Sequence, residues 1–283
     1  VSNCSFPNEF LLLPFADTRE LQLLHFGLFL GIYLAALLGN GLTITTIACS
    51  HHLHSPMYFF LLNLTLLDLG NITTTVPKAV DNSLWDTRVI SYKGCATQVI
   101  MFVAFLAAEF YLLTFMAYDL YVAICKPLHY GAIMASRTCQ HGSTAWGSGF
   151  LLAVLHTANT FSLPFCQGNA LDQFFCEIPQ ILKLSCSDAY LREAGFLVVS
   201  VCFVSGCFVF ILFSYVRIFR AKAFSTCLPH LAVLKPPSMS SSSLNLLLAV
   251  LYSVVPPAVN PLIHNLRKQD LKDAVWKVMT GCF

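Results

Sequence analysis

The chain has 283 residues, of which 57% are hydrophobic and only 11% are charged. Soluble domains carry about 25% charged residues, so this composition excludes an ordinary soluble protein and indicates a membrane protein. The formal net charge is only +2, which gives a nucleic-acid-binding role no electrostatic support.

Long apolar runs recur along the chain, and several approach the roughly 20 residues that a helix needs to cross a bilayer. A membrane-spanning segment must satisfy its backbone hydrogen bonds internally, which leaves helices and closed barrels. The runs are continuous and do not alternate between polar and apolar residues, so they predict helices. The predicted fold class is therefore all-α, a polytopic membrane bundle.

The chain divides into a polar head at residues 1–22, a membrane domain at residues 23–264 and an amphipathic tail at residues 265–283. Between the last two spans, residues 223–234 are apolar but number only about 12, roughly half of what a crossing needs. The clear spans, in chain order, are residues 23–48, 56–80, 97–118, 143–163, 195–219 and 243–263.

The head carries the triplet Asn3-Cys4-Ser5, which is a glycosylation acceptor if the head faces the lumen. A chance match is the alternative, because such triplets are common. Two further triplets begin at Asn63 and Asn71 within a predicted span, where the transferase does not reach them. The predicted glycosylation site is therefore Asn3.

Lysine and arginine gather on one side of the predicted bundle, and such an excess marks the cytoplasm. The head is therefore predicted outside and the tail inside, which demands an odd number of spans. Six clear spans become seven only if the short piece at residues 223–234 also crosses. The basic residues on that side are Lys126, Arg137, Arg217, Arg220, Lys222, Arg267, Lys268, Lys272 and Lys277.

Besides Cys4 in the head, four cysteines fall on the predicted outer side. Cys95 lies at the outer end of the third span, and Cys166, Cys176 and Cys186 lie between the fourth and fifth spans. Thiols that face an oxidising compartment tend to form disulfides, but sequence alone does not say which of them pair. A zinc site is a poor alternative, because the chain has no Cys-x-x-Cys pair.

The third span ends in MAYDLYVAICKPLHY at residues 116–130. Other motifs occur in order along the chain: GN at 39–40, HSPMYFFL at 54–61, SY at 214–215, KAFSTCLPHL at 222–231 and PAVNPLI at 257–263. Together they resemble the odorant receptors, a branch of the rhodopsin-like G-protein-coupled receptors, over nearly the whole chain. Within that family the chain looks most like the group 14 receptors, which are abundant in birds and reptiles.

The resemblance implies a seven-transmembrane, rhodopsin-like bundle in the plasma membrane, surrounded by lipid and with its N-terminus outside. It implies a receptor that binds small volatile odorants and raises cyclic AMP through a heterotrimeric G protein of the olfactory type. An enzyme is not expected. A channel or transporter would predict inverted repeats, which the sequence lacks.

The sixth helix is truncated relative to that family. In relatives the apolar run after Leu231 continues for a full span, whereas here Lys235-Pro236-Pro237 follows almost at once. A short stub does not serve as the lever that opens the G-protein site. The alternative function is therefore a non-signalling receptor remnant retained in the endoplasmic reticulum, or an incomplete gene model.

The resemblance also implies the disulfides Cys95–Cys176 and Cys166–Cys186. It places an apolar ligand pocket in the outer half of the bundle, as suits small volatile ligands. The alternative is that the candidate side chains belong to the core or face lipid. The candidate ligand-contact residues are Phe102, Val103, Leu106, Ala107, Asn159, Val198, Val201 and Cys202.

Two carboxylates, Asp68 and Glu109, lie within apolar spans, where acidic groups are costly and usually functional. The resemblance places both toward the central polar pocket, where a shared sodium or other cation would relieve their repulsion. The alternatives are one protonated carboxyl group, or a neutral hydrogen-bonded pair with a packing role. No other cofactor is expected.

The expected switch residues depart from the family at two positions. In relatives an arginine at the position of Leu120 pairs with the acid at Asp119 and later reaches the G protein; leucine has no donor. Tyr121, Asn260 and Pro261 match the family, and Pro261 is expected to kink its helix. His264 stands where relatives have tyrosine. Loss of the pairing that holds the receptor inactive would raise its basal activity. The alternative, which the short sixth helix favours, is weak or absent coupling.

Overall fold

The computed structural model describes residues 8–12, 18–49, 55–85, 87–125, 130, 137–166, 168–185 and 187–220. The predicted stub at residues 223–234, the last span and the tail lie outside them. In the described part the strands are β1 (Glu9–Leu12), β2 (Val89–Ser91) and β3 (Ala170–Leu171), and the helices are α1 (Arg19–Cys49), α2 (Pro56–Trp85), α3 (Tyr92–Cys125), α5 (Thr138–Phe161), α6 (Ile178–Lys183) and α7 (Ser187–Arg220).

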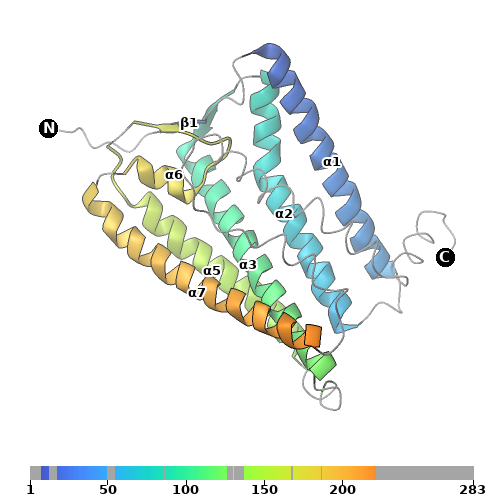
Figure 1. Ribbon diagram of the computed structural model, residues 1–283. Helices are drawn as coiled ribbons and strands as arrows, with labels where there is room; N and C mark the ends of the chain where they lie inside the picture. The colour runs from blue at the N-terminus through green and yellow to red at the C-terminus, as the bar shows by residue number, and fades with distance from the viewer. Residues whose placement is uncertain are drawn as a thin grey trace.

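Long helices lying side by side make up most of the described structure, with the strands and α6 at one end (Figure 1). Of the described helices, α1, α2, α3 and α7 are long and apolar enough to cross a membrane. Helix α5 has 24 residues and spans about 36 Å at 1.5 Å per residue, so its length also suits a crossing. The prediction of a helical membrane bundle is confirmed.

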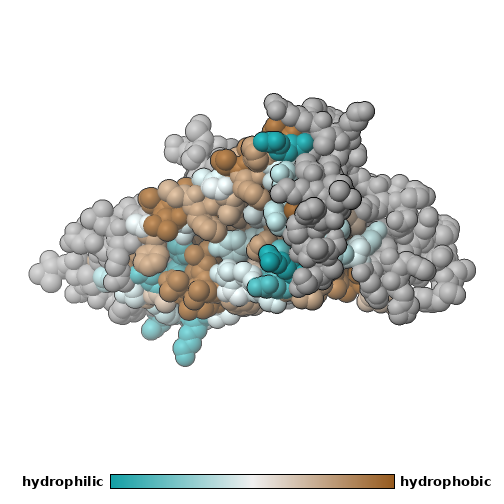
Figure 2. Space-filling view, turned by 90° about the horizontal axis from the view of Figure 1, so that it is seen from below, coloured by the Kyte–Doolittle hydropathy of each residue, from teal (hydrophilic) through white to brown (hydrophobic). Residues whose placement is uncertain are grey.

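Large apolar side chains lie exposed on the outer faces of the helices, among them Leu24, Leu28, Leu38, Leu151 and Val199. Figure 2, seen from below relative to Figure 1, shows brown hydrophobic residues in several areas of the coloured surface, interspersed with pale and teal ones. Exposed large apolar side chains on membrane-length helices suit lipid and not water. These faces are therefore the ones that meet the hydrocarbon of the bilayer.

Helix α3 is the centre of the described bundle, because it packs against α2, α5 and α7. The backbones of α3 and α5 come close together at Gly149. A Cβ atom built at Gly149 would lie 2.8 Å from the carbonyl oxygen of Ala104 and 2.9 Å from the backbone nitrogen of Ala108. Small residues that let two backbones meet are typical of helix pairs in membranes.

A hydrogen bond also joins α5 to α2. The Trp146 indole Nε1–H donates to the side-chain oxygen of Asn63 at 3.0 Å. The ring of Trp146 meets that of Phe105 edge to face, at 6.2 Å between ring centroids. The indole therefore satisfies its one donor while its apolar part completes the packing between three helices.

The polar head takes part in the fold through a three-stranded sheet of order β2-β1-β3. Strand β1 pairs antiparallel with β2 and parallel with β3. Alternation along the strand buries Phe10 and Leu12 and leaves Leu11 exposed, as the period of two requires. The sequence did not predict these strands, because runs of two to four residues are too short to show a period.

Tyr92 connects this sheet to the helices. Its ring stacks on Phe10 with centroids 6.1 Å apart, and its hydroxyl donates to the carbonyl oxygen of Phe161 at 2.7 Å. The head is thus held against the outer ends of α3 and α5.

Candidate functional site

A disulfide joins the outer end of α3 to the loop that follows α5. Cys95 and Cys176 form this bond, with their Cα atoms 5.5 Å apart, and both are fully buried. This is the pairing that the resemblance implied. Cys166 is also disulfide-bonded, but its expected partner Cys186 lies outside the described residues, so that pairing stays a prediction.

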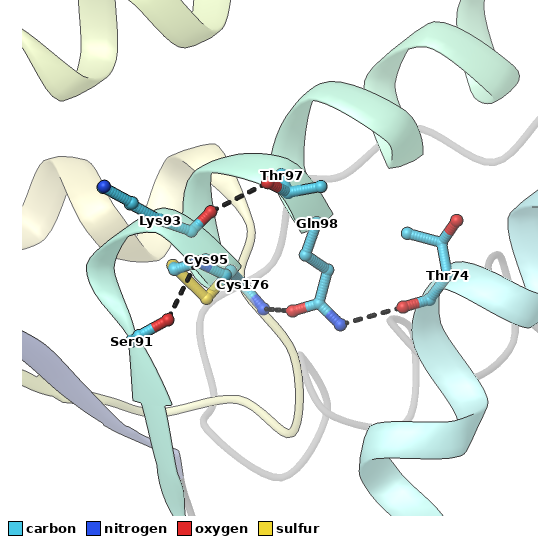
Figure 3. The surroundings of a disulfide bond; sticks show 8 residues. Thr74, Ser91, Lys93, Cys95, Thr97, Gln98 and Cys176 are labelled. Carbon is cyan, nitrogen blue, oxygen red and sulfur yellow. Dashed lines mark hydrogen bonds between the residues drawn. A yellow bond between two sulfur atoms is a disulfide. The ribbon is translucent and has the colours of Figure 1, made fainter.

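A buried amide lies beside the first disulfide (Figure 3). Gln98 donates its Nε2–H to the carbonyl oxygen of Thr74 at 3.0 Å. Its Oε1 accepts the backbone N–H of Cys176 at 2.8 Å. The loop is therefore tied to α3 by a covalent bond and, through Gln98, to α2 by hydrogen bonds.

Three of the predicted ligand-contact residues come together beneath this loop. Phe102 is buried in an outer aromatic cluster with Ala79, Phe174 and Phe175. The ring of Phe102 lies 5.1 Å from that of Phe175, and the Phe174 and Phe175 rings lie 4.7 Å apart. The remaining two, Val103 and Leu106, are partly buried and pack against the cluster.

Sequence reasoning missed Phe174 and Phe175, although both immediately precede Cys176. Once Cys176 is bonded to Cys95, the two residues before it must lie near the outer turns of α3. Their position next to Cys176 could therefore have indicated that they lie near the predicted pocket. Both side chains are fully buried, so the loop covers the cluster.

The other predicted ligand-contact residues do not join this cluster. Ala107 and Asn159 are half-buried on α3 and α5. On α7, Val198 and Val201 are 61% and 60% exposed, and Cys202 is exposed. The described residues therefore bring three of the α3 candidates together in one packed cluster and leave the α7 candidates exposed, so the ligand-contact set stays a prediction.

The two intramembrane carboxylates are buried, with Asp68 0% and Glu109 2% exposed. Asn71 lies one turn from Asp68 on α2, and neither polar atom of its amide has a hydrogen-bond partner. The Oε1 atom of Glu109 also has none. Buried polar atoms are normally paired, and oxygen donors are what hard cations prefer, so these buried groups are the candidate ligands for a cation, which stays a prediction.

No group of three or more His, Cys, Asp and Glu side chains gathers anywhere in the described part of the chain. A cation held by Asp68 and Glu109 would therefore take its other ligands from amides, backbone or water. Such a mixed, oxygen-rich set suits sodium better than a transition metal, for which nitrogen and sulfur ligands are usual.

At the inner end of α3, Asp119 accepts a hydrogen bond from the hydroxyl of Tyr130 at 3.1 Å. Burial, the negative charge of Asp119 and this hydrogen bond raise the pKa of Tyr130 to about 12. The phenol therefore keeps its proton at physiological pH and acts as the donor. The sequence predicted that Asp119 lacks its usual arginine partner, and the structure supplies a tyrosine from the following segment.

Leu120 and Tyr121 contact a small apolar cluster that joins α3 to α7. The buried members of this inner cluster are Ala117, Ile211 and Tyr215, with Leu120 and Tyr121 partly buried against them. An arginine would bring a charge to this position, whereas leucine packs there as an apolar side chain. The other predicted switch residues, Asn260, Pro261 and His264, and the glycosylation site Asn3 lie outside the described residues.

Comparison with known proteins identifies the family to which the chain is similar. The family model described as Olfactory receptor matches residues 29–281. Human Olfactory receptor 14C36 is 44% identical over 299 residues, which cover 97% of this chain and 96% of the relative. Human Olfactory receptor 14I1 is 44% identical over 307 residues, covering 100% and 99%. Human Olfactory receptor 14A16 is 42% identical over 304 residues, covering 99% and 98%.

These relatives are named with the predicted group number 14; they are human, so the association with birds and reptiles stays a prediction. The aligned stretches of 299 to 307 residues are longer than the chain of 283 residues. The relatives therefore carry residues within the alignment that this chain lacks.

Proposed function

Since the chain belongs to the olfactory receptor family, we propose that it binds small, apolar, volatile odorants and reports them through a heterotrimeric G protein of the olfactory type. Receptors of this family are multi-pass membrane proteins and not enzymes. The proposed signal is a rise in cyclic AMP. The proposed location is the plasma membrane, with the N-terminus outside and a sugar on Asn3.

The outer aromatic cluster is the observation that carries the binding part of this proposal. In the disulfide-anchored loop the ring of Phe175 packs against both Phe174 and Phe102, and Val103 and Leu106 border the cluster. Apolar surroundings with few polar groups suit ligands that bind mainly by burial and dispersion. The proposed contacts on the same and other helices are Ala107, Asn159, Val198, Val201 and Cys202.

The test measures cyclic AMP in cells that carry the olfactory G protein and the tagged receptor. A panel of volatile aliphatic and aromatic odorants is the probe. We expect at least one odorant to raise cyclic AMP. We expect Phe102→Ala to weaken the potency of that odorant by about ten- to a hundredfold, because a buried ring contributes roughly 1.5 to 3 kcal/mol. Leu38→Ala is the matched control, since Leu38 is 73% exposed on the outer face of α1.

A second candidate function is a non-signalling receptor remnant held in the endoplasmic reticulum. It is favoured by Leu120, whose apolar packing against Ile211 and Tyr215 replaces the donor that relatives carry, and by the residues that the relatives have and this chain lacks. Surface staining separates the candidates. A chain that gives no cyclic AMP response and does not reach the cell surface supports the remnant hypothesis. A response only from Leu120→Arg would keep the binding proposal and overturn the signalling one.

We also propose that Asp68 and Glu109 hold a sodium ion together with amide or water oxygens. Support comes from the buried Glu109 Oε1 and Asn71 amide atoms that lack hydrogen-bond partners in the described structure. In purified receptor, sodium is expected to raise the midpoint of thermal unfolding relative to choline at equal ionic strength, because it binds the folded state. Glu109→Gln should remove that rise. If sodium raised the unfolding midpoint equally in the parent receptor and in Glu109→Gln, the proposed sodium site would be wrong.

A further inference from the structure

We propose that Gln98 is a positioning residue that sets the register of the loop segment Phe174-Phe175-Cys176 over the outer aromatic cluster. The side chain is only 7% exposed, and both of its polar groups are used. One end donates to the carbonyl oxygen of Thr74 on α2, and the other accepts from the backbone N–H of Cys176. Gln98 therefore bridges two elements that have no covalent link to each other (Figure 3).

The bridge has a chemical requirement that only an amide of this length meets. Glutamate offers oxygen to Cys176 but, when ionised, no donor to Thr74. Methionine fills a similar volume and forms neither bond. Loss of the amide would leave the buried N–H of Cys176 without its partner, and an unsatisfied buried donor costs more than the bond itself contributes.

The disulfide alone does not determine where the loop lies. One covalent link holds Cys176 near Cys95, but the backbone on either side can still rotate about that point. The hydrogen bond from the Cys176 N–H fixes the direction of the chain at the residue that follows Phe175. Because Phe175 lies against Phe102, the bond to Gln98 determines which ring surface the loop presents there.

For an odorant receptor this register is a determinant of ligand specificity, and that meaning rests on the proposed function. The geometric claim is separate from it: without Gln98, the loop shifts and Phe102 loses its cover. Phe102 is 5% exposed, so its uncovering is measurable without any ligand.

The experiment follows the reaction of a cysteine reporter, Phe102→Cys, with a membrane-impermeant maleimide. The full chain is used in open membrane fragments, so that protein retained inside the cell is also measured. Labelling of the parent chain without a reporter is subtracted, because Cys49, Cys139 and Cys202 are exposed. With Gln98→Met we expect about tenfold faster labelling of the reporter, as loss of a buried bond promotes local opening.

Two controls make the readout specific to the loop. A second reporter, Ile72→Cys, occupies a fully buried position on α2 in a different cluster, and its labelling should stay slow with Gln98→Met. Thr97→Val removes a hydrogen bond that Thr97 donates within α3, to the carbonyl oxygen of Lys93. It should leave the Phe102→Cys reporter protected.

Equal labelling of the Phe102→Cys reporter with and without Gln98→Met would overturn the proposal. Faster labelling of both reporters would also overturn it, because Gln98 would then support the whole bundle and not the loop. Gln98→Glu is the second variant, and with it we expect the Phe102→Cys reporter to label at an intermediate rate. If Gln98→Met does not accumulate, a Gln98→Glu variant whose reporter labels as slowly as it does with Gln98 intact would overturn the proposal. No odorant or G protein is needed, so a failed cyclic AMP response does not affect the outcome.

Discussion

Cys176→Ser is expected to lower the free energy of unfolding by about 4 to 5 kcal/mol and to remove most of the receptor from the cell surface. The bonded residues are 81 positions apart, so the bond closes a long loop of the unfolded chain, and closure of long loops contributes most in the chain-entropy model. Surface staining of a tagged chain and thermal unfolding of purified protein measure the two effects.

Three further variants serve as controls for the disulfide. Cys95→Ser should match Cys176→Ser, and the double variant should lose no more than either single one, because all three lack the same bond. Cys139→Ser removes an exposed free thiol on α5 and should leave surface staining unchanged. Additive losses in the double variant would mean that the two sulfurs act separately and that the bond is not the source of the effect.

Gly149→Val is expected to destabilise the bundle by more than about 3 kcal/mol, the upper range for overpacking a tight interior. A Cβ atom at this position already meets the Ala104 carbonyl oxygen at 2.8 Å. Backbone atoms cannot rotate away as a side chain can, so α3 and α5 must separate. The expected measurement is a large fall in the thermal unfolding midpoint and in the yield of folded receptor.

Gly147→Val is the matched control two residues earlier on the same helix. No atom lies within 4 Å of a Cβ placed at Gly147, so this variant keeps only the modest helix-propensity difference between glycine and valine. Similar midpoints for the two variants would show that the α3–α5 contact tolerates separation, contrary to the packing described above.

Much of the fold was predictable because hydrophobic run length is a local property of the chain. The helices α1, α2, α3 and α7 each contain a predicted span, since enough consecutive apolar residues allow few other structures in lipid. The helices extend beyond the predicted spans into polar turns, which composition alone does not mark. The short sheet escaped prediction because Phe10 becomes a core residue only when β1 lies between β2 and β3.

The candidate site was predictable in part. Phe102, Val103 and Leu106 were expected from the resemblance, and the structure gathers them under the loop. The rings of Phe174 and Phe175 were not expected, because loop residues show no period that assigns them a face. Which side chains cover a site depends on how a loop folds back, and no local pattern encodes that.

The sequence by itself determined that this chain is a helical membrane protein of the olfactory receptor family, and it located the departures at Leu120 and in the shortened sixth helix. Only the tertiary structure decided that Tyr130 satisfies Asp119 and that Gln98 links Thr74 to Cys176. The Gln98 contacts join residues 24 and 78 positions apart. The physical reason is that a polar group finds its partner only after helices pack, whereas an apolar run selects a helix before any packing occurs.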